Sequence, residues 1–551
     1  MSLLLYVRNR FLILSFFLLL LNGKRVLINW NIRELVGKNL DLLVLIDWIS
    51  LVFFFTLCLI VSCVLKFSRI YMEGEKFFER FHYLVYCFVF SMVCLIFFPH
   101  FFFMLVGWDG LGITSFLLVI YYLRGSSWAA GMKTYLINRL GDGLFLVALG
   151  LLLIQGHWDI KGVDRKRIYK GFIIVLILGC FTKRAQFPFS RWLPAAMAAP
   201  TPVSSLVHSS TLVTAGVYIL VRFKYIIPNW GLLLIGLLGL WTLYRASLAA
   251  CFEWDAKKIV AFSTLRQLGF MVVSISLGLS TFAFFHLVTH AMFKAMMFIC
   301  VGYLMVKKNH FQDLRSLSGM WKCRPVVRLS LIMRRFSLMG IPFMSGFFSK
   351  ELIVETNLFV IKEVYFQLLL FSLPLTSFYA CRLVFNLLNG KGYNVVSRKN
   401  DKNIVLMSLL PLFIGRIVVG NIMRDRFLRI SSLYPCHLFK VQLNLFILSG
   451  VILALFRRIN NSRRFSWFSS EIAFIKPFKG NYWLEKGRKI GEDINYLFDQ
   501  GNIRKMIASS DRNLLRSGSS LRKIKNYFRS PKMSMYILII LRIILLNWCL
   551  I

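Results

Sequence analysis

The chain has 551 residues, of which 58% are hydrophobic and 16% aromatic, whereas soluble globular domains are about 45–50% apolar. Its formal net charge of +43, from 67 Lys and Arg against 24 Asp and Glu, would ordinarily suggest nucleic-acid binding. Most basic residues lie in short loops and after Phe456, where the positive-inside rule and anionic lipid account for them, so we expect no nucleic-acid partner. The cysteines form no CxxC pair, and Walker and GxGxxG motifs are absent, so nothing indicates a disulfide framework, a metal site, an Fe–S cluster or a nucleotide site.

Apolar runs recur almost from end to end of the chain. A helix needs about 20 apolar residues to cross a bilayer, so the runs predict an all-α polytopic membrane protein with about 14–16 transmembrane helices. The N-terminus is apolar almost from Met1, and we expect a first transmembrane helix there rather than a signal peptide. The principal runs are residues 42–65, 83–98, 144–154, 231–240, 364–374, 404–419 and 535–551.

The first candidate functional residues are acids inside apolar segments. Asp109 lies in the sequence GWDGLG, at the predicted start of a helix that ends near Tyr122. Because Asp costs about 2.5–3.5 kcal/mol at the centre of a membrane helix, it needs a partner, and Lys183 is the best candidate. The alternative places Asp109 at an interface near a loop. Asp142 is a second candidate acid, which Arg139 could instead neutralise in a structural salt bridge.

The next segment combines a lysine with a broken helix. A helix predicted from near Phe172 carries Lys183 and stops at Pro188, and an apolar segment with His208 follows. In lipid, broken backbone and charge are tolerated only where they face protein or water, so this arrangement predicts movement of protons or small cations. A desolvated lysine beside a carboxylate can act as a protonation switch; the alternative for Lys183 is a structural role. The further prolines of the break are Pro194, Pro200 and Pro202.

His208 has two interpretations. A single histidine among apolar neighbours is usually a satisfied core residue. Its hydroxyl neighbours Ser209, Ser210 and Thr211 could instead hold a water chain, which would make His208 part of a proton path.

Two adjacent lysines follow further along the chain. Lys257 and Lys258 come directly after Asp255, and neighbouring helix positions point to different faces. We expect one lysine to face inward and the other to extend to the headgroups. The alternative is that both are ordinary interfacial charges.

One apolar helix carries three ionisable residues on a single face. His286, His290 and Lys294 have the spacing i, i+4, i+8, which predicts a proton relay. A zinc site is the alternative for the histidines, but no third ligand is near in sequence, and core packing is the remaining interpretation.

A second break precedes Lys350. The cluster Gly340-Ile341-Pro342 and Gly346 again interrupts an apolar segment before a lysine. Lys350 is the predicted terminal proton donor or acceptor, with Glu351 as a secondary candidate. A Lys350–Glu351 loop charge pair is the alternative.

Paired broken segments in the two halves of a membrane chain are typical of transporter repeats. After Arg457 the chain becomes charge-rich, with Ile490, Ile494 and Leu497 at helical spacing, which predicts a lateral amphipathic helix; the alternative is a poorly ordered basic loop. The predicted regions are N-terminal transmembrane helices (1–80), a first repeat (81–225), a second repeat (226–385), further transmembrane helices (386–456), a basic amphipathic lateral-helix region (457–534) and a C-terminal transmembrane anchor (535–551).

Together these motifs resemble the chain 5 family of mitochondrial NADH–ubiquinone oxidoreductase, the antiporter-like subunits of respiratory complex I, in an invertebrate-like form. The resemblance covers about residues 47–355, and the combination is far more specific than any one motif. It rests on GWDGLG (107–112), NRLGD (138–142), residues 183–216, KKIVAFST (257–264), THAMFKA (289–295) and residues 340–351.

The resemblance implies a distal proton-pumping subunit of the mitochondrial inner membrane, with antiporter-like repeats and a lateral helix near residues 481–507. It implies that this chain binds no cofactor, and that NADH, FMN, Fe–S clusters and ubiquinone belong to other subunits. The implied partners are the other membrane-arm subunits and inner-membrane lipids, including anionic lipid. The family's pumping residues carry over to Asp109, Lys183, His208, His290, Lys294 and Lys350.

The chain departs from the family pattern at several positions. Many members have Glu in place of Asp109, so its contact with Lys183 is expected to run through water, and Glu351 replaces a more usual Asp. Close relatives usually have serine at Arg184, Arg191 and Arg266. Arginines at membrane depth would cost several kcal/mol each, so our hypothesis is that serine codons were rendered as arginine, which would also explain part of the net charge.

Two other functions compete with a redox-driven proton pump. A stand-alone cation/proton antiporter is the nearest alternative, and the C-terminal amphipathic region argues against it because such a region suits strapping to neighbouring subunits. A structural scaffold is the other, and a scaffold could dispense with costly buried charges.

Overall fold

The computed structural model describes residues 26–35, 38–154, 170–308, 310–317, 325–340, 344–360, 363–388, 402–423 and 437–456. All of them fall in the first of two compact units, residues 1–474, and the second unit, residues 475–551, lies outside them. The predicted lateral helix (457–534), the C-terminal anchor (535–551) and any helix before residue 26 therefore lie outside the described residues.

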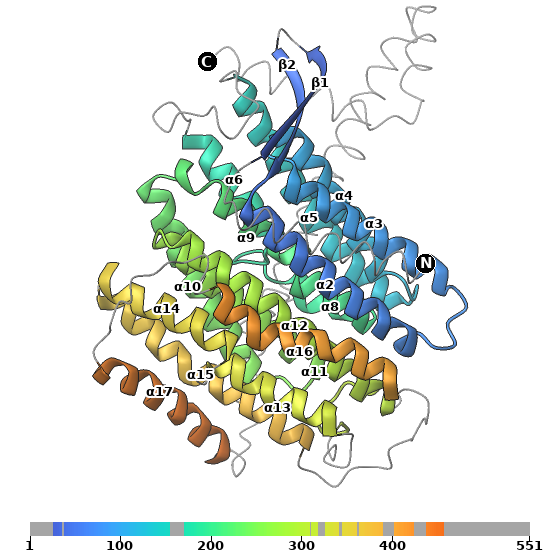
Figure 1. Ribbon diagram of the computed structural model, residues 1–551, viewed down its shortest axis with the longest axis vertical. Helices are drawn as coiled ribbons and strands as arrows, with labels where there is room; N and C mark the ends of the chain where they lie inside the picture. The colour runs from blue at the N-terminus through green and yellow to red at the C-terminus, as the bar shows by residue number, and fades with distance from the viewer. Residues whose placement is uncertain are drawn as a thin grey trace, which may run out of the picture. The chain divides into compact units, whose positions relative to one another are not determined.

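Helices form most of the described structure (Figure 1). Within the described residues, nine helical segments are long and apolar enough to cross a membrane, so the prediction of a polytopic helical protein is confirmed. The elements are β1 (Val26–Leu35), β2 (Lys38–Ile46), α2 (Trp48–Tyr71), α3 (Phe78–Phe97), α4 (Phe101–Val119), α5 (Gly125–Ile154), α6 (Lys170–Lys183), α7 (Trp192–Ala195), the 3₁₀ helix η1 (Ala196–Ala198), α8 (Thr201–Ser209), α9 (Leu212–Arg222), the 3₁₀ helix η2 (Lys224–Ile226), α10 (Asn229–Phe252), α11 (Ala256–Ser276), α12 (Ser280–Lys307), α13 (Pro325–Met339), α14 (Ser345–Val360), α15 (Glu363–Leu388), α16 (Lys402–Met423) and α17 (His437–Phe456).

A hairpin near the N-terminus departs from the all-α prediction. Strands β1 and β2 pair antiparallel, from Val26 opposite Ile46 to Leu35 opposite Lys38. Their β-branched residues favour extended backbone, and polar residues around the turn interrupt the run of about 20 apolar residues that a membrane helix needs. Residues 26–35 and 38–46 are therefore strands where we predicted helix.

Helix α2 begins directly after the hairpin because Asp47 caps it. The Asp47 carboxylate accepts from the Ser50 N–H at 3.0 Å, and the Ser50 hydroxyl accepts from the Asp47 N–H at 2.9 Å. The same carboxylate accepts from both terminal nitrogens of Arg222, at 2.5 and 2.8 Å. Tyr218, one turn earlier on α9, donates to the Ile96 carbonyl of α3 at 2.8 Å. These bonds join the start of α2 to the ends of α9 and α3.

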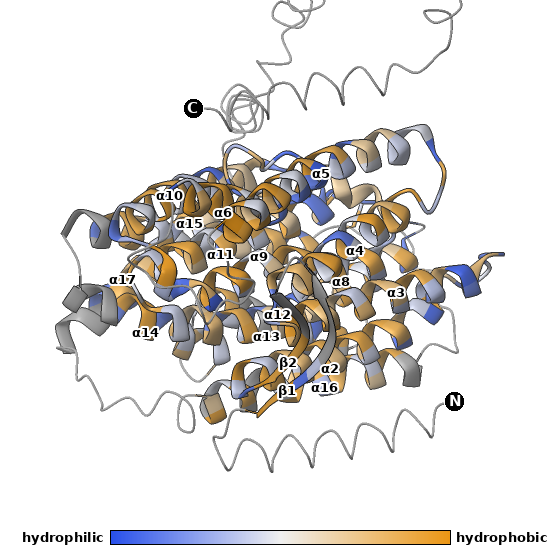
Figure 2. Cartoon of the chain, turned by 90° about the horizontal axis from the view of Figure 1, so that it is seen from above, coloured by the Kyte–Doolittle hydropathy of each residue, from blue (hydrophilic) through white to orange (hydrophobic). Residues whose placement is uncertain are grey.

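Helix α12 lies at the centre of the packing. It contacts α2, α8, α9, α11, α13, α14 and α16, and Figure 1 shows it between α2 and α8 on one side and α13 and α14 on the other. All residues from 283 to 305 are buried. Figure 2 shows that apolar residues dominate the helices and that hydrophilic ones gather in short patches. Because residues 283–305 are buried, the polar side chains in this part of α12 face protein rather than lipid.

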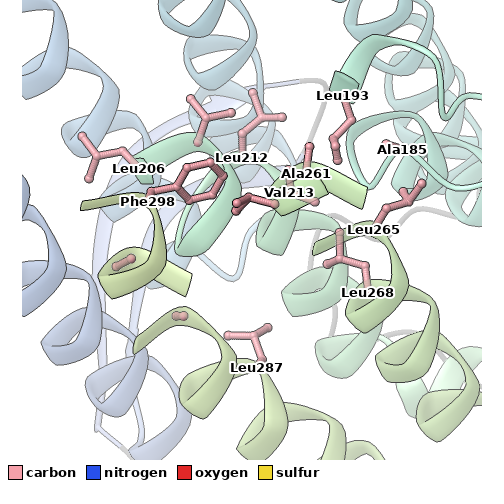
Figure 3. Packing of buried hydrophobic residues seen from close by; sticks show 14 of the residues in the cluster. Ala185, Leu193, Leu206, Leu212, Val213, Ala261, Leu265, Leu268, Leu287 and Phe298 are labelled. Atoms are coloured by element: carbon pink, nitrogen blue, oxygen red, sulfur yellow. The ribbon is translucent and has the colours of Figure 1, made fainter. Parts of the chain in front are cut away.

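Apolar side chains surround the break in the first repeat. Leu193 and Leu206 of the broken segment, Leu265 of α11 and Phe298 of α12 are all buried there (Figure 3). Protein interiors are close-packed, so a polar group in this layer must be hydrogen-bonded by protein or by ordered water.

Candidate functional site

The first part of the site is the C-terminus of α6, which ends at Lys183. Ala185 has a φ of 54°, in the left-handed region, and the Gln186 N–H bonds to the Phe181 carbonyl at 3.1 Å. This is the 6→1 bond of a Schellman motif, with alanine where glycine is usual. Pro188 follows and cannot continue the helix, so the predicted break is confirmed.

Lys183 is fully buried where α4, α5 and α6 meet. Its Nζ donates to the Trp108 carbonyl and lies 4.1 Å from the centroid of the Trp108 ring. The same Nζ is 3.6 Å from Asp142 Oδ1. Gly112 of α4 lies beside both groups, since a Cβ there would be 3.7 Å from the Asp142 carboxylate and 3.9 Å from Lys183 Nζ. The ammonium group is thus held by one carboxylate, one carbonyl and one aromatic face.

Asp109 occupies a different place from the one predicted. It lies in the middle of α4, because that helix already begins at Phe101. Its carboxylate is 3.8 Å from Arg139, which is also 3.6 Å from Asp142. The side chain of Asp109 is 32% exposed, whereas that of Asp142 is 6% exposed and faces α6. The predicted Asp109–Lys183 pairing is therefore corrected: the partner of Lys183 is Asp142, and Arg139 links the two carboxylates.

His208 lies on α8, beyond the break. Its ring stacks with those of Trp192 and Phe298, at centroid distances of 6.4 and 6.0 Å. The side chain is 1% exposed, and neither ring nitrogen has a hydrogen-bond partner among the described residues. Buried polar groups are normally hydrogen-bonded, so the contacts that the structure describes do not fit the interpretation of a satisfied core histidine.

The two adjacent lysines of α11 face opposite ways, as predicted. Lys257 is buried, and its Nζ donates to the Ala199 carbonyl at 3.2 Å, just before α8. Lys258 is 42% exposed, pairs with Asp255 and lies 3.9 Å from Glu253. Lys257 is thus a candidate for the site, and Lys258 is an interfacial charge.

The histidines of α12 lie on one face, with ring centroids 6.3 Å apart. His286 Nδ1 is 2.9 Å from the Ser349 hydroxyl, and its Nε2 is 3.2 Å from Gln267 Oε1. Neither nitrogen of His290 has a hydrogen-bond partner in the part of the chain that the structure describes. His286 is therefore fixed between two helices, while His290 makes no such bond to the described residues.

The second break separates α13 from α14. Gly340 has a φ of 89°, a left-handed conformation that glycine adopts readily, and its N–H bonds to the Phe336 carbonyl at 3.0 Å. The predicted Ile341 and Pro342 lie outside the described residues.

Lys350 extends back from α14 toward this break. It is buried, and its Nζ donates to the Leu338 carbonyl. Gly346 allows α14 to approach α13, because a Cβ there would be 2.1 Å from the Ser337 carbonyl oxygen. Glu351, the neighbouring acid, is half-buried.

Four polar residues of the site were not singled out in the sequence. Ser263 accepts from Lys294 Nζ at 2.5 Å, while Gln267 and Ser349 contact His286. Ser263 and Gln267 are spaced i, i+4 on α11, and this spacing could have placed both on one face of that helix. In the structure this face contacts α12. The fourth, Asn138, lies one turn before Asp142 and is buried without a hydrogen-bond partner for its amide among the described residues.

Two of the three unusual arginines are deeply buried. Arg184 is 0% exposed and reaches the Leu268 carbonyl at 3.5 Å, while Arg266 is 1% exposed and donates to Ser372 at 3.2 Å. The Nε and Nη1 atoms of both lack hydrogen-bond partners among the described residues. Arg191 is exposed, so the argument from burial does not apply to it.

Each of the four buried lysines of the site donates a hydrogen bond to an uncharged oxygen. Lys183, Lys257 and Lys350 each donate to a main-chain carbonyl, and Lys294 donates to a hydroxyl. Ionisable groups inside a membrane are costly and typically mark ion or proton paths. What these lysines, His208, His286, His290 and Asp142 share chemically is the ability to take up and release protons. Among the residues described, no group of three His, Cys, Asp or Glu side chains is arranged to hold a metal ion.

Comparison with known proteins shows which family and which proteins the chain is similar to. Residues 99–376 match a family described as NADH:quinone oxidoreductase/Mrp antiporter, TM. NADH-ubiquinone oxidoreductase chain 5 is 47% identical over 363 residues in Lumbricus terrestris, 43% over 388 in Mytilus edulis and 42% over 436 in Aedes aegypti. These alignments cover 65%, 69% and 76% of this chain and 63%, 68% and 75% of the relatives. The match with the Lumbricus protein thus spans less than two thirds of its length.

Solved structures show the same fold at lower identity. A chain of the Mrp complex from Dietzia sp. has a TM-score of 0.71 and 21% identity, over 96% of this chain and 57% of that chain. A chain of the membrane-bound sulfane sulfur reductase, an archaeal respiratory membrane complex, has a TM-score of 0.68 and 20% identity, over 82% of this chain and 91% of that chain.

Proposed function

Because the chain belongs to the NADH:quinone oxidoreductase/Mrp antiporter family, we propose that it is a proton-translocating membrane subunit of respiratory complex I in the mitochondrial inner membrane. The chain itself holds no redox centre; NADH, FMN, Fe–S clusters and ubiquinone are bound by other subunits. Its partners are the neighbouring membrane-arm subunits and inner-membrane lipids, including anionic lipid.

The observation that carries this proposal is the set of ionisable groups buried beside two helix breaks. Asp142 and Lys183 precede the first break, His208 follows it, and Lys350 follows the second. Helix α12 brings His286, His290 and Lys294 between them, since it contacts both α8 and α14. Moving one charge through 100 mV is worth about 2.3 kcal/mol. This energy is comparable to the free energy by which a protein can favour one protonation state of such a group over the other.

Two measurements test the proposal. A native gel of detergent-solubilised mitochondria, stained for NADH oxidation and followed by peptide mass spectrometry, is expected to find the chain in the active band. In the assembled complex, Lys183→Met is expected to lower the proton-to-electron ratio, while the exposed Lys170→Met on the same helix leaves it unchanged. An unchanged ratio in Lys183→Met would count against a pumping role.

A stand-alone cation/proton antiporter is the second candidate, because the family and the fold also include Mrp proteins. It predicts sodium-dependent proton transport in liposomes without NADH oxidation. Finding such transport, with the chain absent from the NADH-oxidising band, would favour the antiporter.

A further inference from the structure

Gln267, His286 and Ser349 form a hydrogen-bonded row across three helices. Gln267 lies on α11, His286 on α12 and Ser349 on α14, and all three are 0% exposed. The row joins Gln267 Oε1 to His286 Nε2 at 3.2 Å and His286 Nδ1 to Ser349 Oγ at 2.9 Å. The row therefore joins the central helix to α14, the helix that also carries Lys350.

The single N–H proton of a neutral His286 ring links the hydrogen bonds at its two nitrogens. A neutral imidazole has one N–H donor and one bare nitrogen acceptor. When Gln267 Oε1 faces the ring, Nε2 must carry the proton, and Nδ1 accepts from the Ser349 hydroxyl. When the Gln267 amide nitrogen faces the ring instead, Nε2 must accept, and Nδ1–H then donates to Ser349.

The Gln267 amide can take either orientation without losing another bond. Its Nε2 has no hydrogen-bond partner among the residues that the structure describes, so a half-turn exchanges a donor for an acceptor and breaks only the bond to His286. The last torsion of a glutamine side chain is broad, which makes this half-turn accessible.

Ser349 can also serve both arrangements. Its hydroxyl is close to His286 Nδ1 and to the Ser345 carbonyl at 3.3 Å, so its proton can point to either. Thr289 Oγ1 lies 3.2 Å from the same hydroxyl and 3.1 Å from the His286 carbonyl, so its single proton can point to either. Ser349 is thus a donor to His286 in one arrangement and an acceptor in the other.

We propose that Gln267, His286 and Ser349 form a two-state switch, in which the orientation of the Gln267 amide sets which nitrogen of His286 carries its proton. The switch rests on the proposed proton-translocating function and assigns Gln267 as a positioning residue within it. Its change of state balances: the Ser349 hydroxyl gives its proton to Nδ1 and takes another from a hydronium ion, Nε2 then releases its own proton to water, and the amide turns to donate to the bare Nε2, so that one proton enters the row and one leaves it.

Matched variants in the assembled complex test the switch. Gln267→Glu keeps an acceptor facing Nε2 but removes the donor, and Gln267→Met removes both. The switch predicts that both variants lower the proton-to-electron ratio as far as Lys183→Met does. Ser349→Ala is expected to do the same, while Ser349→Thr, which keeps the hydroxyl, retains the ratio. Ser274→Ala, another buried hydroxyl on α11 that bonds only its own helix, serves as the control.

A merely structural Gln267 gives a different result, since Gln267→Glu would then keep the bond to His286 and the normal ratio. Infrared difference spectra with isotope-labelled histidine provide a second readout. The wild type is expected to show both neutral tautomers of His286 during turnover, and Gln267→Glu only the Nε2–H form. A single tautomer in the turning-over wild type overturns the switch. If Lys183→Met also leaves the ratio unchanged, the proposed function fails; if only the Gln267 and Ser349 variants do so, the switch alone fails.

Discussion

Lys183 Nζ lies 3.6 Å from Asp142 Oδ1, and this buried ion pair joins α5 to α6 immediately before the first helix break. Asp109 forms its ion pair in this cluster with Arg139, which is 3.8 Å from its carboxylate and 3.6 Å from that of Asp142. The two acids are therefore expected to differ in importance.

Asp142→Asn is expected to impair the subunit more than Asp109→Asn. Removing one member of a buried ion pair costs about 3–5 kcal/mol, because it leaves the charge of Lys183 uncompensated, whereas a partly exposed pair such as Asp109–Arg139 contributes about 0–1 kcal/mol. The proton-to-electron ratio and the yield of assembled complex measure the difference. Equal effects would contradict the expected difference, and a larger effect of Asp109→Asn would restore Asp109 as the main partner of Lys183.

Local features of the sequence predicted the breaks but not this pairing. Pro188 and Gly340 act on their own backbone, so each break can be placed from the chain alone. The choice of Asp142 over Asp109 depends on which face of α5 packs against α6, and that is a tertiary property. The hairpin of residues 26–46 was missed because apolar residues after Asp41 resemble the start of a membrane helix.

Lys257 and Lys258 provide a matched pair of neighbouring charges. Lys257→Met is expected to lower the proton-to-electron ratio, because the buried Nζ and its bond to the Ala199 carbonyl are lost. Lys258→Met removes a 42% exposed charge from a surface pair, so it is expected to leave the ratio unchanged. The same coupled assay measures both variants, and a larger loss in Lys258→Met would contradict the assignment of Lys257 to the site.

Gly346 is predicted to be essential for the position of Lys350. In Gly346→Ala the new Cβ would meet the Ser337 carbonyl oxygen at 2.1 Å, so α14 must move away from α13 and carry Lys350 with it. We expect a reduced yield of complex and a reduced proton-to-electron ratio. Gly143→Ala on α5, where a Cβ meets nothing within 4 Å, is the control, and wild-type behaviour in both variants would contradict the prediction.

Asp47 makes the stability of the chain depend on pH. Burial acts to raise the pKa of its carboxyl, but the bonds from Arg222 and Ser50 outweigh burial and hold the pKa below the ordinary value of 3.8. A carboxyl with a depressed pKa stabilises the fold above its unfolded-state pKa, and this contribution is lost as pH falls through the folded-state value. Thermal unfolding of the full chain in detergent should therefore show a falling melting temperature as pH drops below about 5.

Two variants separate the roles of Asp47. Asp47→Asn removes the charge but keeps an efficient N-cap, so it should lower the melting temperature at neutral pH and flatten the acid dependence. Asp47→Ala also removes the cap and is expected to cost about 1 kcal/mol more. An acid dependence that persists in Asp47→Asn would assign the effect to another group.

Arg184 and Arg266 are the residues whose identity the structure brings most into question. Each buries a guanidinium, two of whose nitrogens have no hydrogen-bond partner among the described residues. An arginine at the centre of a membrane helix costs about 2.5–3.5 kcal/mol on insertion scales. A serine at either position would remove that cost and leave a hydroxyl able to bond within its own helix. If serine codons were rendered as arginine, tryptic peptides of the native protein will continue through position 266, and their masses will fit serine there and at 184. Cleavage after 266, or arginine masses at both positions, would contradict the hypothesis and leave two uncompensated charges within the apolar layer around α11.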